Sequence, residues 1–239
     1  MLNLILIAIT LLVQPAEPVE LLPGIRVADG VVEFDAEIAI DAHHPETPDV
    51  YLEMFITAPD SREHESLLVA KIKPSNLHAA LLAAGFESGA PLTRDESGNV
   101  TKAHGDPLRV LVSIKVSQDE AAVFIPITDW VMQVETETSI IENEQWEGLV
   151  FAGSKLTRRG YEADGTGTLV SLTSFSNEVI APAWTLWHEA DIDEPIWIAN
   201  RELLPKKGQK VIVQIIAPQP TEQGDDSHEP ERVNIDRDP

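Results

Sequence analysis

The chain has 239 residues, with 40 acidic and 17 basic side chains, a net charge of −23 and no cysteine. Apolar residues make up 43% of it, enough to fill a globular core. The missing cysteines exclude disulfides, thiolate catalysis, iron–sulfur clusters and cysteine-ligated zinc. The negative charge argues against nucleic acid or an anionic membrane surface as a partner, because both attract clustered Lys and Arg.

The N-terminal segment is an apolar run from Leu2 to Val13 that only Asn3 and Thr10 interrupt. The run is shorter than a membrane-spanning helix, which needs about 20 residues. It resembles the hydrophobic region of a secretory signal. A hydrophobic first strand or an uncleaved anchor is the alternative. We therefore expect residues 1–16 to be a signal-like segment and the protein to be exported to the periplasm or the extracellular space.

The middle of the chain shows alternating apolar and polar residues, which predict β-strands. The clearest alternations cover residues 32–40, 50–56 and 108–116. Shorter strands are expected at residues 67–72, 121–127, 149–152, 168–175 and 211–217. Asp164 and Gly165 indicate a hairpin-type turn before one of these strands.

One segment, residues 74–84, has the pattern of an amphipathic helix. Pro74 suits the first helical position, and Gly85 follows where a left-handed cap ends a helix. A second, short helix is expected near residues 200–204. The predicted fold class is therefore α+β, an antiparallel-rich β structure with one clear helix.

The C-terminal segment, residues 218–239, contains seven acids, two arginines and four prolines. Such a segment buries too little apolar surface to offset the entropy lost on ordering. We expect a disordered acidic tail there, which leaves residues 17–217 as a single domain.

A second acidic region lies between Glu33 and Glu65, with ten acids and one arginine. Glu33, Asp35 and Glu37 fall on one face of a predicted strand, about 7 Å apart at alternate positions. Calcium prefers six to eight oxygens that converge from a loop. A flat strand face spreads its carboxylates, so we expect a solvated surface.

Histidines are the strongest candidates for chemistry, because the sequence contains none of the common catalytic motifs and neutral imidazole binds metals and moves protons. His64 and Glu65 come just before the strand at 67–72, and His78 lies at the edge of the helix's apolar stripe. A strand followed directly by a helix packs that helix on its own sheet, which would bring His64 and His78 together.

These residues form a candidate functional cluster of His64, Glu65 and His78. His43 and His44, in the loop before residue 50, are further candidate ligands for a divalent metal. The alternative is structural, with His78 as a half-buried packing residue and His64 as a surface residue.

Two tryptophans, Trp184 and Trp187, lie three residues apart. Exposed indoles at this spacing would stack on a sugar ring or a proline-rich peptide. Buried indoles would instead supply core area.

Two stretches resemble the YdjY-domain family, namely residues 63–68, Glu-His-Glu-Ser-Leu-Leu, and residues 77–85, Leu-His-Ala-Ala-Leu-Leu-Ala-Ala-Gly. Residues 89–91, Gly-Ala-Pro, match the element that often follows in that family, and a looser similarity extends over residues 23–217. The resemblance implies an exported bacterial protein and emphasises the unit from His64 to Gly85. It implies no reaction.

The signal-like start and the missing catalytic motifs together favour a non-enzymatic binding or envelope-associated module, with a partner that the sequence does not specify. The alternative is a metal-dependent enzyme or metal-binding protein. In that case a metal held by His64, Glu65 and His78 would activate water.

Overall fold

The structure is a computed structural model, and it describes residues 18–45, 49–114 and 122–218. In this part of the chain, strands predominate and two α-helices occur, α1 (Pro74–Ala83) and α2 (Glu162–Thr166). The predicted mixture of strands and helix is therefore present, but the fold is dominated by β structure. None of the described helices is long and apolar enough to cross a membrane.

The main sheet follows the order β14-β4-β5-β3-β17-β8-β11-β15. These strands are β14 (Thr168–Ser171), β4 (Met54–Thr57), β5 (Ser66–Val69), β3 (Val31–Ile38), β17 (Lys210–Ile216), β8 (Pro107–Ile114), β11 (Leu149–Val150) and β15 (Ala181–Pro182). Three more join beside them: β1 (Val19–Leu22), β2 (Ile25–Ala28) and β9 (Ile125–Pro126). Within this sheet the described pairs are antiparallel, except for parallel β4 and β5.

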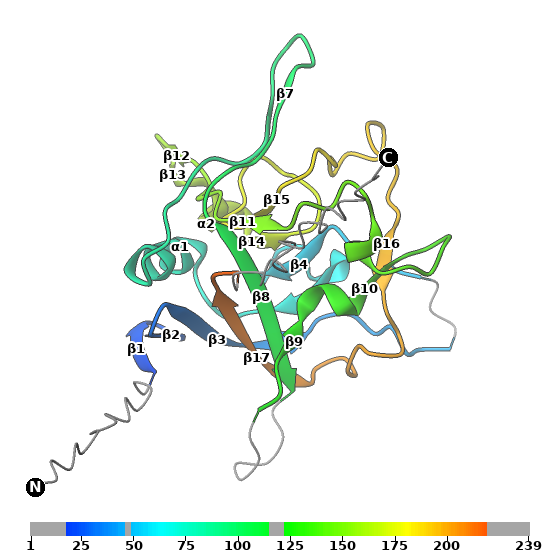
Figure 1. Cartoon of the computed structure of the whole chain (residues 1–239), viewed down its shortest axis with the longest axis horizontal. Coiled ribbons are helices and arrows are strands. Elements are labelled where there is room, and N and C mark those ends of the chain that lie inside the picture. Colours follow the sequence, from blue (N-terminus) through cyan, green and yellow to red (C-terminus); the bar gives the residue numbers. More distant parts are fainter. Residues whose placement is uncertain (1–17, 46–48, 115–121, 219–239) are drawn as a thin grey trace, which may run out of the picture.

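The two ends of this strand order almost meet. Val170 of β14 forms a parallel bridge with Ile180, the residue before β15, and the Ser171 N–H donates to the Ile180 carbonyl at 3.0 Å. The sheet is therefore nearly closed and barrel-like, with the long strands β8 and β17 crossing its centre (Figure 1).

Six short strands form separate two-stranded ladders. They are β6 (Thr93–Arg94) with β7 (Val100–Thr101), β10 (Val131–Gln133) with β16 (Trp197–Ala199), and β12 (Leu156–Thr157) with β13 (Gly160–Tyr161). Three turns of 3₁₀-helix complete the described elements: η1 (Glu63–Glu65), η2 (Ile127–Trp130) and η3 (Ile140–Glu142).

The alternation in β3 explains how the sheet makes its core. The even-numbered side chains from Val32 to Ile38 are buried, and the odd-numbered ones point to the other face. Val211, Val213 and Ile215 of the neighbouring strand β17 are fully buried in the same way. Such period-2 patterns made these strands predictable from sequence.

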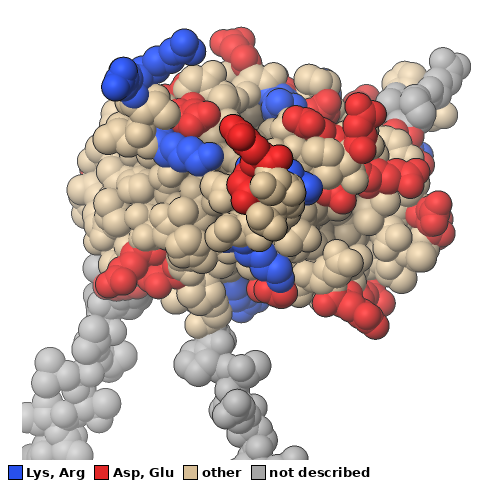
Figure 2. Space-filling model, turned by 90° about the horizontal axis from the view of Figure 1, so that it is seen from above, with Lys and Arg blue, Asp and Glu red and all other residues tan. Residues whose placement is uncertain are grey.

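The acidic residues on the other face of β3 have cationic neighbours. Arg26 of β2 pairs with Glu33 and Asp35 at 2.8 and 3.2 Å, and Lys71 lies 3.8 Å from Glu37. The predicted carboxylate ladder is therefore a cross-strand ion-pair network. Elsewhere, acidic side chains are scattered over the face shown in Figure 2, with fewer basic ones among them.

Helix α1 confirms the predicted helix at 74–84. Its end is closed by two backbone bonds, from the Phe86 N–H to the Leu81 carbonyl at 3.1 Å and from the Gly85 N–H to the Leu82 carbonyl at 3.0 Å. This is the Schellman arrangement, and Gly85 adopts the left-handed conformation it requires, with φ of 98°.

Two local predictions are wrong. Residues 200–204 form a turn rather than a helix, closed by the Leu204 N–H on the Asn200 carbonyl at 2.9 Å, because the following Pro205 disfavours helical backbone at Leu204. Asp164 and Gly165 lie inside α2 and make no hairpin turn. Tertiary contacts of Asp164 with the start of α1 favour the helical turn there.

Predictions at both ends lie outside the described residues. These are the signal-like segment at 1–16 and nearly all of the acidic tail at 218–239. Part of the strand predicted at 121–127 is described, and it contains only the short β9.

Candidate functional site

His64 and Glu65 lie in the η1 turn directly before β5, as the sequence indicated. His64 is exposed, and its Nε2 lies 3.3 Å from Glu65 Oε1. Glu65 Oε2 accepts a hydrogen bond from Arg62 Nη1 at 3.3 Å. The His–Glu pair is thus the outer part of a larger charged network.

The inner part of that network is Glu53, which precedes β4. Because β4 and β5 run parallel, the residues before both strands lie side by side, and the Glu53 N–H donates to the Glu65 carbonyl at 3.0 Å. Arg62 Nη1 also donates to Glu53 Oε2 at 3.0 Å. We call Glu53, Arg62 and Glu65 the acid cluster.

Burial, followed by the hydrogen bond and the charge of Glu65, raises the pKa of Glu53 to about 7. The charge of Arg62 acts in the opposite direction. Glu53 therefore keeps its proton up to near neutral pH, and Arg62 lies beside it and Glu65 as a counter-charge.

A ladder of stacked rings extends from the acid cluster. Arg62 Cζ lies 4.4 Å from the Phe175 ring centroid, and Phe175 stacks on His188 at 4.4 Å. His188 lies 5.7 Å from Trp187, and Arg94 Cζ lies 5.6 Å from the Trp187 ring. Burial, followed by the charge of Arg62, lowers the pKa of His188. We call Phe175, His188 and Trp187 the ring ladder.

The two candidate stacking tryptophans have different surroundings. Trp184 is only 3% exposed, its Nε1 donates to the Leu172 carbonyl at 3.0 Å, and its ring packs against Trp146 and Trp197. Trp184 is therefore a core residue. Trp187 is half-buried in the ring ladder, and its role in ligand stacking stays a prediction.

His78 belongs to a different network, formed with the segment from Phe151 to Tyr161. Its Nδ1 lies 3.1 Å from the Gly153 carbonyl and 3.0 Å from the Tyr161 hydroxyl. The Tyr161 hydroxyl itself donates to the Gly153 carbonyl at 3.0 Å. The His78 ring packs edge-on against Phe151 and Tyr161. Burial lowers the pKa of His78 and raises that of Tyr161, so both are neutral at pH 7.

Gly153 is the residue that lets this network close. Its φ is +82°, and a Cβ atom there would lie 2.8 Å from Ser88 Cβ and 3.2 Å from His78 Cε1. Only glycine combines this backbone conformation with this close approach. The turn at 151–154 is thus a structural partner of the helix that carries His78.

The predicted metal ligands are distributed over the molecule. His64 contacts Glu65, whereas His78 contacts Gly153 and Tyr161. His43 Nε2 lies 2.7 Å from the Leu204 carbonyl, and His44 is exposed. Within the described residues, no group of three or more His, Asp or Glu side chains is arranged to hold a metal. A metal at His64, Glu65 and His78 stays a prediction.

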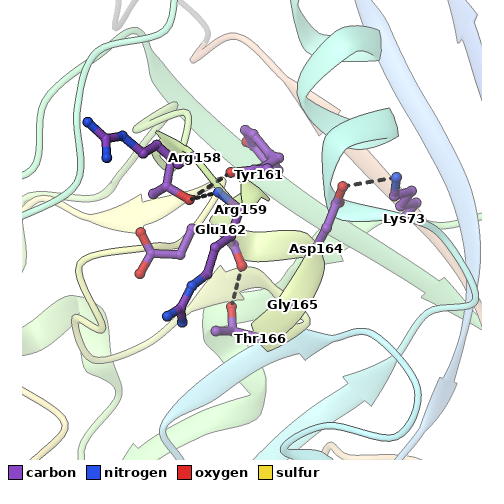
Figure 3. A pocket seen from close by; sticks show the side chains of 10 residues that line it. Lys73, Arg158, Arg159, Tyr161, Glu162, Asp164, Gly165 and Thr166 are labelled. Atoms are coloured by element: carbon purple, nitrogen blue, oxygen red, sulfur yellow. Dashed lines mark hydrogen bonds and ion pairs between the residues drawn. The ribbon is translucent and has the colours of Figure 1, made fainter.

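A cavity of about 920 Å³ lies between the β12–β13 hairpin, α2 and the start of α1 (Figure 3). We call it the Tyr161 pocket; its lining includes Lys73, Arg158, Arg159, Tyr161, Glu162 and Asp164. The hydroxyl of Tyr161 is the link between this pocket and the His78 network.

A family model for the YdjY domain matches residues 26–216. The chain belongs to the YdjY-domain family. No curated protein and no solved structure gives a significant match. The matched range contains the acid cluster, the Tyr161 pocket and the barrel-like sheet apart from β1 and the first residue of β2.

Several residues at these sites of the YdjY domain escaped the sequence reasoning. Glu53 meets Glu65 through strand pairing, and Phe175 meets Arg62 and His188 through loop packing, which leave no local pattern. Arg158 and Arg159 did leave a signal, because two adjacent arginines stand out in a chain with only 17 basic residues.

Proposed function

We propose that this YdjY-domain protein is a non-enzymatic binding module that captures its ligand in the Tyr161 pocket. The observation that carries the proposal is a cavity of about 920 Å³, comparable with known ligand sites, which run to about 1,000 Å³. Its wall includes Tyr161, whose hydroxyl is fixed by Gly153 and His78. A cavity anchored to the core in this way is preorganised for binding.

The polar groups in the pocket support binding rather than a reaction. Lys73 Nζ lies 3.0 Å from Asp164 Oδ2, so this ammonium already has a counter-charge. The Tyr161 hydroxyl is occupied by the Gly153 carbonyl, and burial raises its pKa further. Among the described lining residues, no nucleophile is paired with a general base.

A ligand-observed NMR screen tests this proposal with fragments that include carboxylates, phosphates, sugars and apolar rings. Gly165 lines the pocket, and nothing lies within 4 Å of the place a Cβ would take there, so Gly165→Trp adds a bulky ring to the pocket wall. Ala83→Trp, at an exposed position of α1, is the matched control. We expect fragments that bind the wild type and the control to lose binding to Gly165→Trp. Equal binding to all three proteins would overturn the proposal.

Export is the second part of the proposal. The apolar run from Leu2 to Val13 supports it, because that run matches the hydrophobic region of a secretory signal. Mass spectrometry of the protein from fractionated cells should find a mature N-terminus near Glu17 outside the cytoplasm. An intact Met1 on cytoplasmic protein would contradict export.

The alternative function is a metal-dependent enzyme or metal-binding protein. The observation in its favour is the approach of His64 Nε2 to Glu65 at 3.3 Å, beside Glu53. Elemental analysis of protein purified without chelator tests it. A stoichiometric metal that is lost in both His64→Ala and His78→Ala would favour this alternative, and metal-free wild-type protein would eliminate it.

A further inference from the structure

We infer that the ligand of the Tyr161 pocket is a small organic anion, whose carboxylate or phosphate is bound by Arg158 and Arg159. This inference rests on the proposed function and adds the chemical class of the ligand. It follows from how the β12–β13 hairpin holds the two arginines and from which charges in the pocket are already compensated.

The hairpin presents both arginines from a fixed turn. Its strands pair Leu156 with Tyr161 and Thr157 with Gly160. Thr157 Oγ1 donates to the Gly160 carbonyl at 3.1 Å and accepts from the Arg159 N–H at 3.2 Å. At the base of the hairpin, Tyr161 is tied to the core through Gly153 and His78. The backbone that carries the guanidinium groups is therefore ordered before a ligand arrives.

The guanidinium groups of Arg158 and Arg159 have no ion pair or hydrogen bond with any described residue, although both arginines line the cavity. Most other arginines of the described chain are engaged, as Arg26 is with Glu33 and Arg62 with Glu53. A planar guanidinium donates paired N–H groups that match the two oxygens of a carboxylate or phosphate. Arg158 and Arg159 therefore each offer an uncommitted guanidinium to an oxyanion at the pocket.

The remaining charges of the pocket leave room for an added anion. Asp164 is compensated by Lys73 Nζ at 3.0 Å (Figure 3). It also accepts a hydrogen bond from the Ser75 N–H at 2.8 Å, in the first turn of α1. Glu162 is the other lining carboxylate, and in the sum of formal charges it cancels the charge of one of the two arginines. One positive charge therefore stays uncompensated in the pocket, in a chain whose net charge is −23.

Glu162 also bears on the kind of anion. In Figure 3 its carboxylate lies on the same side of the hairpin as the guanidinium groups. A carboxylate can only accept hydrogen bonds. A ligand that carries hydroxyl groups beside its oxyanion can therefore donate to Glu162 with a hydroxyl and accept from the arginines with the oxyanion. Sugar acids and sugar phosphates have this chemistry.

Calorimetric titration of the full chain with glucose, glucuronate and phosphorylated glucose tests the inference, because these probes differ only in the charged group. We expect dissociation constants of about 1 mM for at least one charged probe and no binding of glucose. Binding of glucuronate would identify a carboxylate as the recognised group, and binding of phosphorylated glucose would identify a phosphate. Added salt should weaken the binding.

The double variant Arg158→Gln with Arg159→Gln should weaken this binding by about tenfold or more. Lys206→Gln with Lys207→Gln changes the net charge equally, and these exposed lysines lie outside the pocket, so this control should bind as the wild type does. The inference is overturned if neither charged probe binds, or if the arginine variant binds them unchanged. The proposed function survives that result if neutral fragments still bind and Gly165→Trp abolishes their binding.

Discussion

The acid cluster and the Tyr161 pocket use arginine in opposite ways. In the acid cluster, Arg62 is bonded to two carboxylates and covered by the Phe175 ring. In the pocket, Arg158 and Arg159 lack such partners among the described residues, and they border a cavity. A guanidinium bonded to carboxylates of its own chain is already occupied, whereas an unpaired guanidinium beside a cavity is available to a ligand.

The two regions also differ in how they respond to pH. Glu53 has a pKa raised to about 7, so the acid cluster changes its charge near neutrality. The pocket is anchored by His78 and Tyr161, which burial keeps neutral there, and it is lined by Arg158 and Arg159. We therefore expect pH to change the stability conferred by the acid cluster and to leave the pocket largely unaltered.

The largest expected effect is on the turn at Gly153, whose carbonyl accepts the hydrogen bond of Tyr161. Gly153→Ala combines a strained φ of +82° with a Cβ only 2.8 Å from Ser88 Cβ. We expect the free energy of unfolding to fall by about 3 kcal/mol. Gly208→Ala is the matched control, because its φ is +79° and nothing lies within 4 Å of its Cβ. It should cost about 1 kcal/mol in urea unfolding. Equal losses would show that the Gly153 contact carries no strain.

The second largest expected effect is on how the free energy of unfolding depends on pH, and it arises in the acid cluster. The pKa of Glu53 is about 7 in the folded protein against 4.5 for an ordinary glutamate, so the folded state binds the proton more tightly. Stability is therefore lost as the pH rises from 4.5 to 7. Glu53→Gln cannot ionise, and we expect it to gain on the order of 2 kcal/mol over the wild type across that range.

Urea unfolding at several pH values measures this difference, with Glu63→Gln, in the η1 turn that also carries Glu65, as the control. The control should follow the wild-type pH dependence. If Glu53→Gln runs parallel to the wild type from pH 4.5 to 7, the raised pKa of Glu53 is refuted.

Much of the fold could be predicted because its patterns are local. The alternation in residues 32–38 and the stripe that ends at Gly85 are properties of neighbouring residues, and both predicted elements formed. The position of His64 and Glu65 at the entry to β5 was predictable for the same reason.

The partners of these residues could not be predicted, because they depend on strand order and register. Glu53 meets Glu65 only because β4 and β5 pair in parallel. His78 meets Tyr161 across 83 positions of sequence, through the β12–β13 hairpin, which was not among the predicted elements. Without the order of strands, the closest plausible partner for His78 was His64.

The smallest effect tests the link between the pocket and the core. Tyr161→Phe removes the hydroxyl that donates to the Gly153 carbonyl at 3.0 Å and keeps the ring that packs on His78. We expect a loss of about 1 kcal/mol in unfolding free energy, the usual net value of one hydrogen bond. Tyr51→Phe, at a residue 44% exposed, should change stability by less than about 0.5 kcal/mol. Because the hydroxyl orders the base of the hairpin, Tyr161→Phe should also weaken anion binding, although less than loss of the two arginines does. A variant with wild-type stability and wild-type affinity would show that the pocket is held by ring packing alone.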